Sequence, residues 1–320
     1  MGKQSMAAGK INEIIGKEAI EKKGWWKAYK WLILRRLSQF GILALFMLIP
    51  ICKWLNPESD CDLGWIIKGN LASSQLFNTI PMTDPMIFLQ MLASGFTNIA
   101  MDAIIGAVLI LVFYLLVGGR VFCSWVCPIN IVTDAAFWLR TKLKLRGGTR
   151  FSRNIRYWVL AMVLVLSAVT GSLAYELVNP VSMLHRGLFF GMTLGWFLIA
   201  GIFLFDLFIT KRGWCTHICP MGAFYGLIGK VSPLKVRADA RAACDDCAEC
   251  YTVCPEAQIL KPVLKGEKKG IPPVILAGEC TNCGRCIDVC GEEVFQFGLR
   301  YKSSLPTVKT VVGSKKEIIG

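Results

Sequence analysis

Eight cysteines in the last third of the chain constrain its fold more than any other feature. They form two runs of one spacing, Cys244-x2-Cys247-x2-Cys250-x3-Cys254-Pro255 and Cys280-x2-Cys283-x2-Cys286-x3-Cys290. In bacterial proteins this spacing holds two [4Fe-4S] clusters, and the fourth cysteine of each run binds the cluster of the other run. Two zinc sites, the alternative for CxxC pairs, would leave the repeated third cysteine without a role, because zinc takes four ligands. The spacing therefore predicts two iron-sulfur clusters and a protein through which electrons pass.

The crossed pairing divides the eight thiolates between two sites. Site A comprises Cys244, Cys247, Cys250 and Cys290, and site B comprises Cys280, Cys283, Cys286 and Cys254. We expect a small α+β domain of the bacterial two-cluster ferredoxin type, residues 231–303, to hold both clusters. Residues 304–320 follow this domain as a tail.

The composition of the chain indicates a membrane protein. Of the 320 residues, 54% are hydrophobic and only 18% are charged. Four apolar stretches approach the ~20 residues that a membrane-spanning helix requires: residues 37–55, 99–117, 157–175 and 188–209. Residues 30–230 are therefore predicted to form a membrane all-α domain of four transmembrane helices, arranged as two repeated hairpins.

The basic residues predict the orientation of these helices. Residues 1–36 carry nine Lys and Arg side chains and residues 118–156 carry eight, whereas residues 56–98 and 176–187 carry one each. Basic connections stay on the cytoplasmic side. We therefore expect a multi-pass protein of the bacterial inner membrane, with both termini and sites A and B in the cytoplasm. The N-terminal segment, residues 1–29, has isoleucines at helical spacing and predicts a short amphipathic helix near the lipid headgroups.

The net charge of +14 has the same origin. The basic residues follow the predicted helix ends, and no nucleic-acid recognition motif accompanies them. We expect membrane lipid, and no nucleic acid, as a partner.

An internal repeat follows the second and fourth apolar stretches. Its copies are Arg120-Val-Phe-Cys123-Ser-Trp-Val-Cys127-Pro128 and Arg212-Gly-Trp-Cys215-Thr-His-Ile-Cys219-Pro220, the first and second CxxxCP repeats. Duplicated hairpins related by an axis along the membrane normal would bring the two cysteine pairs together at the cytoplasmic surface.

The four repeat cysteines, Cys123, Cys127, Cys215 and Cys219, are called site C. Three interpretations of site C stay open at this point. The thiols form a third metal or redox site, they serve thiol-disulfide chemistry or the docking of a partner, or they are structural residues at a helix end closed by proline. The remaining cysteines, Cys52 and Cys61, fall on the outer side, where either a disulfide or two free thiols are compatible with the sequence.

Only two histidines are present, His185 and His217, and the predicted topology places them on opposite sides of the membrane. A haem held by two histidines of this chain is therefore excluded, and an organic carrier, quinone, is expected beside the clusters. Quinol oxidation releases two protons, so its site needs hydrogen-bonding and titratable groups. The candidates are His185, Asp84, Asp102 and Glu176. For each of them a purely structural or headgroup contact is the alternative. Asp206, inside the fourth stretch, is expected to pair with Lys211 or Arg212.

The order of these features resembles the NapH family of membrane ferredoxins of periplasmic nitrate reductase systems, over residues 30–303. The resemblance is carried by Gly278-Glu-Cys280-Thr-Asn-Cys283-Gly-Arg-Cys286-Ile-Asp-Val-Cys290, by Val294-Phe-Gln-Phe297 and by Cys254-Pro255-Glu256. It implies an oxidoreductase component, a quinol dehydrogenase subunit that takes electrons from menaquinol or ubiquinol. It also implies a NapG-like iron-sulfur partner, sometimes a tetrahaem cytochrome, and a periplasmic reductase as the destination. Related proteins of methylamine utilisation share CxxxCP elements.

Two other functions fit the same residues. Electrons could flow in reverse, from a cytoplasmic reductant to quinone or a partner, or the chain could act as a membrane anchor and assembly scaffold. The direction of electron flow distinguishes the first alternative from the expected function. A requirement for the cluster cysteines distinguishes the expected function from a scaffold.

Overall fold

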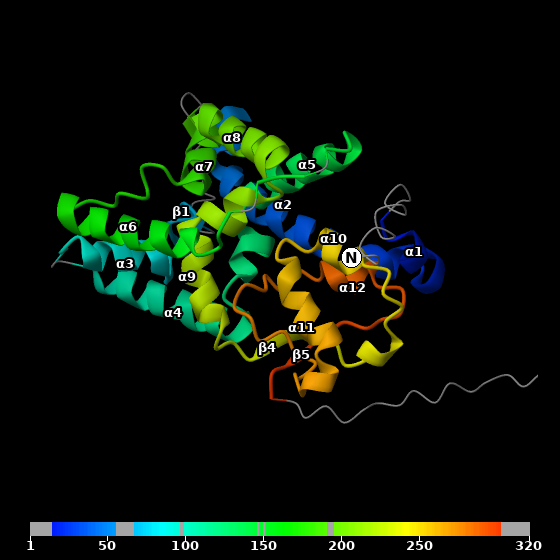
Figure 1. Ribbon diagram of the computed structural model, residues 1–320. Coiled ribbons are helices and arrows are strands. Elements are labelled where there is room, and N and C mark those ends of the chain that lie inside the picture. The colour runs from blue at the N-terminus through cyan, green and yellow to red at the C-terminus, as the bar shows by residue number, and fades with distance from the viewer. Residues whose placement is uncertain are drawn as a thin grey trace, which may run out of the picture.

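The computed structural model describes residues 15–55, 67–96, 99–145, 147–149, 151–190 and 195–301. These residues form a helical part and a smaller C-terminal part, which lies at the lower right of Figure 1. The fold is mostly helical, as predicted.

The helical part contains eight α-helices among the described residues. They are α2 (Trp25–Leu55), α3 (Pro85–Ala93), α4 (Met101–Val117), α5 (Ile129–Lys142), α6 (Ile155–Thr170), α7 (Pro180–Phe190), α8 (Gly195–Leu204) and α9 (Pro220–Gly229). Three short π-helical segments join them: η3 (Phe122–Val126), η4 (Phe205–Ile209) and η5 (Trp214–Ile218). The extra residue in each π turn widens the helix at η3 and η5, within the two CxxxCP repeats.

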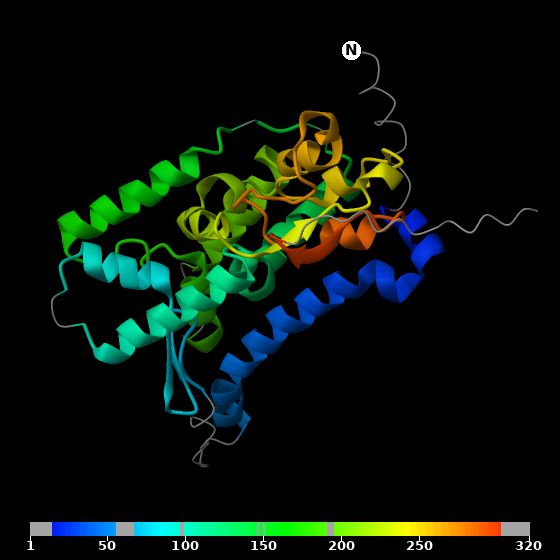
Figure 2. The same ribbon diagram turned by 90° about the horizontal axis from the view of Figure 1, so that it is seen from below.

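One described helix is long and apolar enough to cross a membrane, the segment Trp25–Leu48 of α2. Met101–Val117, Ile155–Thr170 and Gly195–Ile209 are apolar but shorter, at 10–17 residues. Four membrane spans arranged as two hairpins therefore stay a prediction. Helix α2 begins at Trp25, well before the expected residue 37, and its first half, which carries the basic residues, lies along the C-terminal part (Figure 2).

The helical part also contains a small sheet, so the all-α prediction for residues 30–230 was wrong in this detail. Strands β1 (Ile67–Gly69), β2 (Ser73–Leu76) and β3 (Ile80–Thr83) pair antiparallel in the order β1-β2-β3. Phe77 and Asn78, both with φ above +50°, form the tight turn between β2 and β3. Left-handed turns of this kind match the twist of a hairpin. The sheet packs on α4, where Gly106 leaves room for the backbone of β3.

The helices gather into two groups around separate cores. In Figures 1 and 2, α3, α4 and α6 lie side by side, and α9 packs against α4 and α6. Their core contains Met86, Tyr114, Leu160, Val163 and Tyr225. The second group packs α5, α7 and α8 around Ile129, Val181, Ile199 and Ile202. Each CxxxCP repeat thus ends one helix and sends the next helix into the other group.

The C-terminal part has the mixed α and β structure that was expected. Strands β4 (Leu234–Arg237) and β5 (Gln296–Leu299) pair antiparallel. The short helices are α10 (Glu249–Val253), α11 (Leu260–Lys265) and α12 (Arg285–Val289), with single 3-10 turns η6 (Arg241–Ala243), η7 (Ala257–Ile259) and η8 (Glu267–Lys269). Apolar side chains from the strands and loops pack around Cys250 and Cys286.

The N-terminal helix α1 (Lys17–Lys23) lies against α12 of the C-terminal part (Figure 2). Lys23 Nζ donates to the carbonyl oxygens of Ile287 and Asp288 at 2.8 and 3.1 Å. A cation at the carboxyl end of a helix is favourable because the last carbonyls have no partner within the helix. The prediction of an amphipathic helix near the headgroups rested partly on Ile11 and Ile14, which lie outside the described residues.

Candidate iron-sulfur sites

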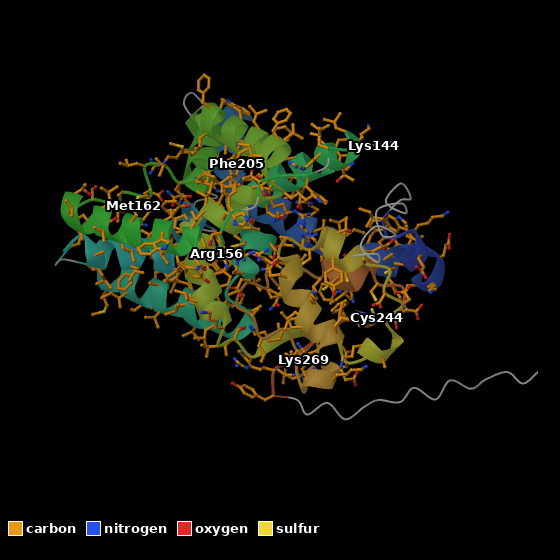
Figure 3. All side chains as sticks on the ribbon, in the orientation of Figure 1. Lys144, Arg156, Met162, Phe205, Cys244 and Lys269 are labelled. Atoms are coloured by element: carbon orange, nitrogen blue, oxygen red, sulfur yellow. The ribbon has the colours of Figure 1, made fainter. Side chains whose placement is uncertain are left out.

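Site A lies at the periphery of the C-terminal part, as the position of Cys244 in Figure 3 shows. One cavity is lined by its four cysteines, Cys244, Cys247, Cys250 and Cys290. Cys247 is exposed to solvent. Asp246 and Ala248 have φ of 62° and 64°, and these left-handed residues turn the loop around the cavity. Site A therefore lies close to the surface.

Site B repeats this backbone in a buried setting. One cavity is lined by its four cysteines, Cys254, Cys280, Cys283 and Cys286. Asn282 and Gly284, with φ of 46° and 72°, occupy the positions that Asp246 and Ala248 hold in site A. A Cβ on Gly284 would lie 2.5 Å from the ring of Trp31, so this position requires glycine for close packing as well as for its conformation. Helix α2 thus covers site B through Trp31.

Site C is formed where the two CxxxCP repeats meet. Its four cysteines, Cys123, Cys127, Cys215 and Cys219, line one cavity together with mainly apolar side chains. The second cysteine of each repeat has nearly the same extended backbone, with φ and ψ of −63° and 118° at Cys127 and −62° and 116° at Cys219. Each N–H donates to the carbonyl five residues before it, Phe122 or Trp214, at 2.9 Å. The thiols of the two repeats therefore line one cavity together.

The donor sets of the three sites fit iron-sulfur chemistry. The twelve cysteines of these sites are free thiols, and the described residues that line the cavity of site C include no histidine or carboxylate. Four thiolates in an apolar cavity suit soft metal centres such as iron-sulfur clusters. Sites A and B would each hold a [4Fe-4S] cluster, which supplies one-electron transfer when bound. The assignment of single cysteines to single clusters stays a prediction.

Sites B and C are linked by direct hydrogen bonds between their loops. Ser124 Oγ, within the first CxxxCP repeat, donates to the Thr281 carbonyl of site B at 2.7 Å. Trp125 Nε1 donates to the Asn282 carbonyl at 3.1 Å. Asn282 Nδ2 in turn donates to the Val117 carbonyl at 3.2 Å. Residues between the cysteines of one site thus bind residues between the cysteines of the other.

A buried carboxylate, Glu256, joins the two parts of the molecule beside site B. It pairs with Arg120 at 2.8 Å, Arg156 at 3.0 Å and Arg153 at 3.2 Å. Arg120, Arg156 and Glu256 are each only 1% exposed. Arg120 also donates to the carbonyl oxygens of Glu279 and Cys215 at 3.0 Å. The guanidinium of the first repeat is thus bound to the C-terminal part and to the second repeat at once.

A second carboxylate, Asp134, has a similar arrangement on the opposite side. It pairs with Arg285 at 2.6 Å, Arg36 at 2.7 Å and Arg212 at 3.1 Å. Burial alone would raise the pKa of Asp134, but Arg285, Arg212 and Arg36 outweigh it and hold the pKa below its usual range. Arg212 also donates to the Val253 carbonyl at 2.7 Å. Neither carboxylate was predicted as part of a site; the signal that could have indicated them is the arginine at the same position in both repeats, Arg120 and Arg212.

The four quinol-site candidates lie in different surroundings. Asp84 is buried, caps α3 through the Met86 N–H at 2.7 Å and faces the Tyr225 side chain. Glu176 accepts a hydrogen bond from Asn179 at 3.0 Å and follows Tyr175, which lines site C. His185 is buried and packs edge-on against Phe46 at 5.2 Å. Asp102 is exposed in the first turn of α4. Asp84 and Glu176 are thus associated with side chains next to site C.

Two further expectations concern Asp206 and the outer cysteines. Asp206 Oδ1 accepts a hydrogen bond from the Trp214 N–H at 3.0 Å, and it has no ion pair within the described residues. The expected pairing with Lys211 or Arg212 was therefore wrong, because Arg212 is drawn to Asp134 instead. Cys52 is disulfide-bonded, and Cys61 lies outside the described residues.

The fold and the three sites define an electron-transfer protein built from a two-cluster ferredoxin part and a duplicated cysteine-bearing helical part. Two family models match the chain. A "4Fe-4S dicluster domain" matches residues 243–294, and a "4Fe-4S binding domain" matches residues 99–146 and 192–238, which contain the two repeats. No solved structure matches it.

Curated relatives identify the family. Ferredoxin-type protein NapH of Escherichia coli (strain K12) is 46% identical over 90% of this chain and 96% of its own length. NapH of Haemophilus influenzae is 47% identical over 90% of this chain and 96% of its length. Methylamine utilization ferredoxin-type protein MauN of Paracoccus denitrificans is 47% identical over 89% of this chain and 95% of its length. The chain belongs to the NapH and MauN family of ferredoxin-type proteins.

Proposed function

We propose that the chain is a membrane subunit that passes electrons between the quinol pool and iron-sulfur clusters, as the quinol dehydrogenase component of a respiratory system with a periplasmic reductase. One observation carries this proposal: the loops of sites B and C are hydrogen-bonded to each other, through Ser124 and Trp125. A buried ferredoxin site and a cysteine site of the helical part are thereby held at a constant separation. Sites A, B and C would form one series for electron transfer. Site A, with exposed Cys247, would be its end at the surface.

Exposed apolar side chains support a multi-pass arrangement in the inner membrane. Trp158 and Val169 of α6 are 76% and 79% exposed, and Phe197 of α8 is 79% exposed. Large apolar side chains of this kind are costly in water but suited to lipid. Together with α2, these helices and α4 would supply four spans, with both termini in the cytoplasm. Their modest lengths suit a locally thinned bilayer or neighbouring protein.

The chain's own residues fix the surroundings of the three sites. Arg120 and Arg212 attach the two repeats to either side of site B, at Glu279 and Val253. Trp31 and Trp125 pack against the same loop, at Gly284 and Asn282. A site C that holds a third redox or metal centre would extend the series into the helical part.

The quinol end is proposed on the side of site C away from site B. Quinol loses two protons with its electrons, so a carboxylate and hydroxyl groups near the electron acceptor are required. Asp84 with Tyr225, and Glu176 beside Tyr175, are the groups that meet this requirement best. His185 remains a further contact, whereas exposed Asp102 is the weakest candidate.

Protein partners are proposed at the exposed end of the series. A NapG-like iron-sulfur protein, with a tetrahaem cytochrome in some systems, would exchange electrons at the surface around site A. NapH and MauN relatives match this chain about equally well, and the name of MauN refers to methylamine utilization.

Iron analysis and rapid mixing test the proposal together. Two [4Fe-4S] clusters bind about eight irons per chain, so a reproducible excess that is lost in Cys127→Ser/Cys219→Ser supports a metal centre at site C. Stopped-flow mixing of the anaerobic protein with a reduced quinol analogue should bleach the cluster absorption. A protein with its full iron content that stays oxidised under quinol contradicts the proposal.

Serine variants separate electron transfer from a scaffold role. Cys250→Ser in site A and Cys286→Ser in site B should abolish respiratory flux while the chain still accumulates in the membrane. Ser74→Ala, in the β-sheet far from the cysteine sites in sequence, is the control. Unchanged flux in both cysteine variants would favour the scaffold. Reduction potentials of the clusters above that of the quinone would favour flow from quinol, and lower potentials the reverse direction.

A further inference from the structure

A wide cavity lies outside the three cysteine sites, beside the second CxxxCP repeat. Its volume is about 640 Å³. The lining combines basic side chains, threonines and backbone, and its principal residues are Gly148, Thr149, Arg153, Lys211, His217 and Pro255. No carboxylate is among the described lining residues. We call it the basic cavity.

The walls of the basic cavity are held in place by hydrogen bonds. The Thr149 N–H donates to the Ile209 carbonyl at 3.0 Å, which ties the loop before α6 to the end of η4. Arg140 donates to the Leu207 carbonyl at 2.6 Å and to the Gly147 carbonyl. Gly148 has φ of +144°, and a Cβ there would lie 3.0 Å from the Ile209 carbonyl oxygen. The loop and the helix end therefore form a preformed wall.

The charges of the basic cavity favour an anion. Lys211 has no hydrogen bond or ion pair within the described part of the chain, and the charged groups that act on it are Arg140 and Arg212. Arg153 is 43% exposed and contacts Glu256 at 3.2 Å through one of its five N–H groups. His217 Nδ1 has no hydrogen-bond partner among the described residues. Arg153 and Lys211 thus offer donors to the cavity, and Glu256, the carboxylate that Arg153 contacts, is shared with the buried Arg120 and Arg156.

The position of the basic cavity favours a particular kind of anion. It lies between the start of α6 and the end of η4, two helices with large exposed apolar side chains. Figure 3 labels Arg156 and Met162 along α6 and Phe205 at the start of η4. Met162 is 60% exposed and Phe208 is 63% exposed. A ligand with an anionic head and apolar chains would match both surfaces.

We propose that the basic cavity binds the headgroup of an anionic phospholipid, whose acyl chains lie along the exposed faces of α6 and η4. This inference rests on the proposed membrane arrangement of these helices. Basic pockets between helices on the cytoplasmic side are suited to anionic headgroups. Pro255 lines the cavity and precedes Glu256, so the bound headgroup would touch the loop that carries Cys254 of site B. The lipid would therefore help to hold the C-terminal part against the membrane.

Native mass spectrometry of the full chain tests the proposal. The protein is delipidated in detergent and incubated with equal amounts of phosphatidylglycerol and phosphatidylcholine. The wild type should retain phosphatidylglycerol over phosphatidylcholine by roughly tenfold or more, as expected for two basic side chains at an anionic headgroup. Arg153→Gln/Lys211→Gln should lose most of this preference. Lys261→Gln/Lys268→Gln, with the same change of charge on the exposed surface of the C-terminal part, should keep it.

Three outcomes would overturn the proposal. They are equal retention of the two lipids by the wild type, an unchanged preference in Arg153→Gln/Lys211→Gln, and displacement of phosphatidylglycerol by inorganic phosphate at equal concentration, which would indicate a soluble anion. Iron content verifies that each variant is folded, and Lys211→Gln alone replaces the double variant if iron is lost. Lipid masses do not depend on quinol oxidation. Equal lipid retention with normal cluster bleaching by quinol would refute the lipid site alone, and the reverse result would refute only the proposed function.

Discussion

The two CxxxCP repeats have almost the same backbone but different surroundings. In both, a π-helical turn ends at an extended cysteine that precedes a proline. The arginine of each repeat binds a carboxylate that two further arginines share. For Arg120 this carboxylate is Glu256, which is 1% exposed, and for Arg212 it is Asp134, which is 11% exposed. The duplicated sequence determines the backbone of the turn in each repeat. The surrounding residues determine which carboxylate the arginine of that repeat binds.

The arginines of the two repeats also bind on opposite sides of site B. Arg120 donates to the Glu279 carbonyl, next to Cys280, and Arg212 donates to the Val253 carbonyl, next to Cys254. Within the described part of the chain, only the first repeat is hydrogen-bonded to the loop of site B through its own inner residues, Ser124 and Trp125. The first repeat therefore connects sites B and C, and the second borders the basic cavity. Four predictions test this division of roles.

The largest effect is expected from the two carboxylates. Glu256→Gln removes the counter-charge of the fully buried Arg120 and Arg156, which should cost about 3–5 kcal/mol. Asp134→Asn should cost less, about 1–3 kcal/mol, because Arg36 is 26% exposed and can turn to water. The measurement is the thermal midpoint of each variant in detergent, followed by circular dichroism. Equal losses in the two variants would show that burial does not distinguish the repeats.

Substitution of the repeat arginines should also have a larger effect in the first repeat than in the second. Arg120→Gln leaves buried carbonyls of Glu279 and Cys215 without a donor, at about 1–3 kcal/mol, and should speed the loss of iron from site B to a chelator several-fold. Arg212→Gln leaves Asp134 with two arginines and should change the rate less. Iron release is followed by absorption. Faster release in Arg212→Gln than in Arg120→Gln would reverse the proposed roles.

A smaller effect is expected within the repeats. The Ser124 hydroxyl crosses to the Thr281 carbonyl at 2.7 Å, whereas the Thr216 hydroxyl bonds the Arg212 carbonyl of its own turn at 2.9 Å. Ser124→Ala should cost about 1–2 kcal/mol and slow cluster bleaching by the quinol analogue. Thr216→Val should leave the bleaching rate near that of the wild type. A wild-type bleaching rate in Ser124→Ala would show that the Ser124–Thr281 hydrogen bond does not contribute to electron transfer.

The smallest effect concerns pH. The pKa of Asp134 is lowered in the folded protein, so its ion pairs contribute stability above the ordinary carboxyl pKa and lose it only as the pH falls. The stability difference between wild type and Asp134→Asn should therefore stay constant between about pH 5 and pH 8. Thermal midpoints across this range check it. A difference that declines below about pH 7 would mean that the three arginines do not control this carboxylate.

Local patterns predicted much of the molecule. Apolar residues at 99–117 correspond to α4 (Met101–Val117), and residues 157–175 overlap α6 (Ile155–Thr170). The repeated cysteine spacing predicted two sites of four thiols, each completed by a cysteine of the other run, and each of these sets lines one cavity. The sheet β1-β2-β3 was missed, since its three- and four-residue strands carry little periodic signal beside long apolar runs.

The sequence by itself determined the class of protein: cysteine spacing, duplicated CxxxCP repeats and apolar stretches are local properties of the chain. Only the tertiary structure showed that Arg120 meets Glu256, 136 residues away, that Ser124 meets Thr281, 157 residues away, and that Arg153 and Lys211 share a cavity. Buried charges pair wherever the packing brings opposite charges together, and spacing along the chain does not encode that meeting. The cluster ligands could therefore be proposed from the cysteine spacing, but the connections between the sites were visible only in the tertiary structure.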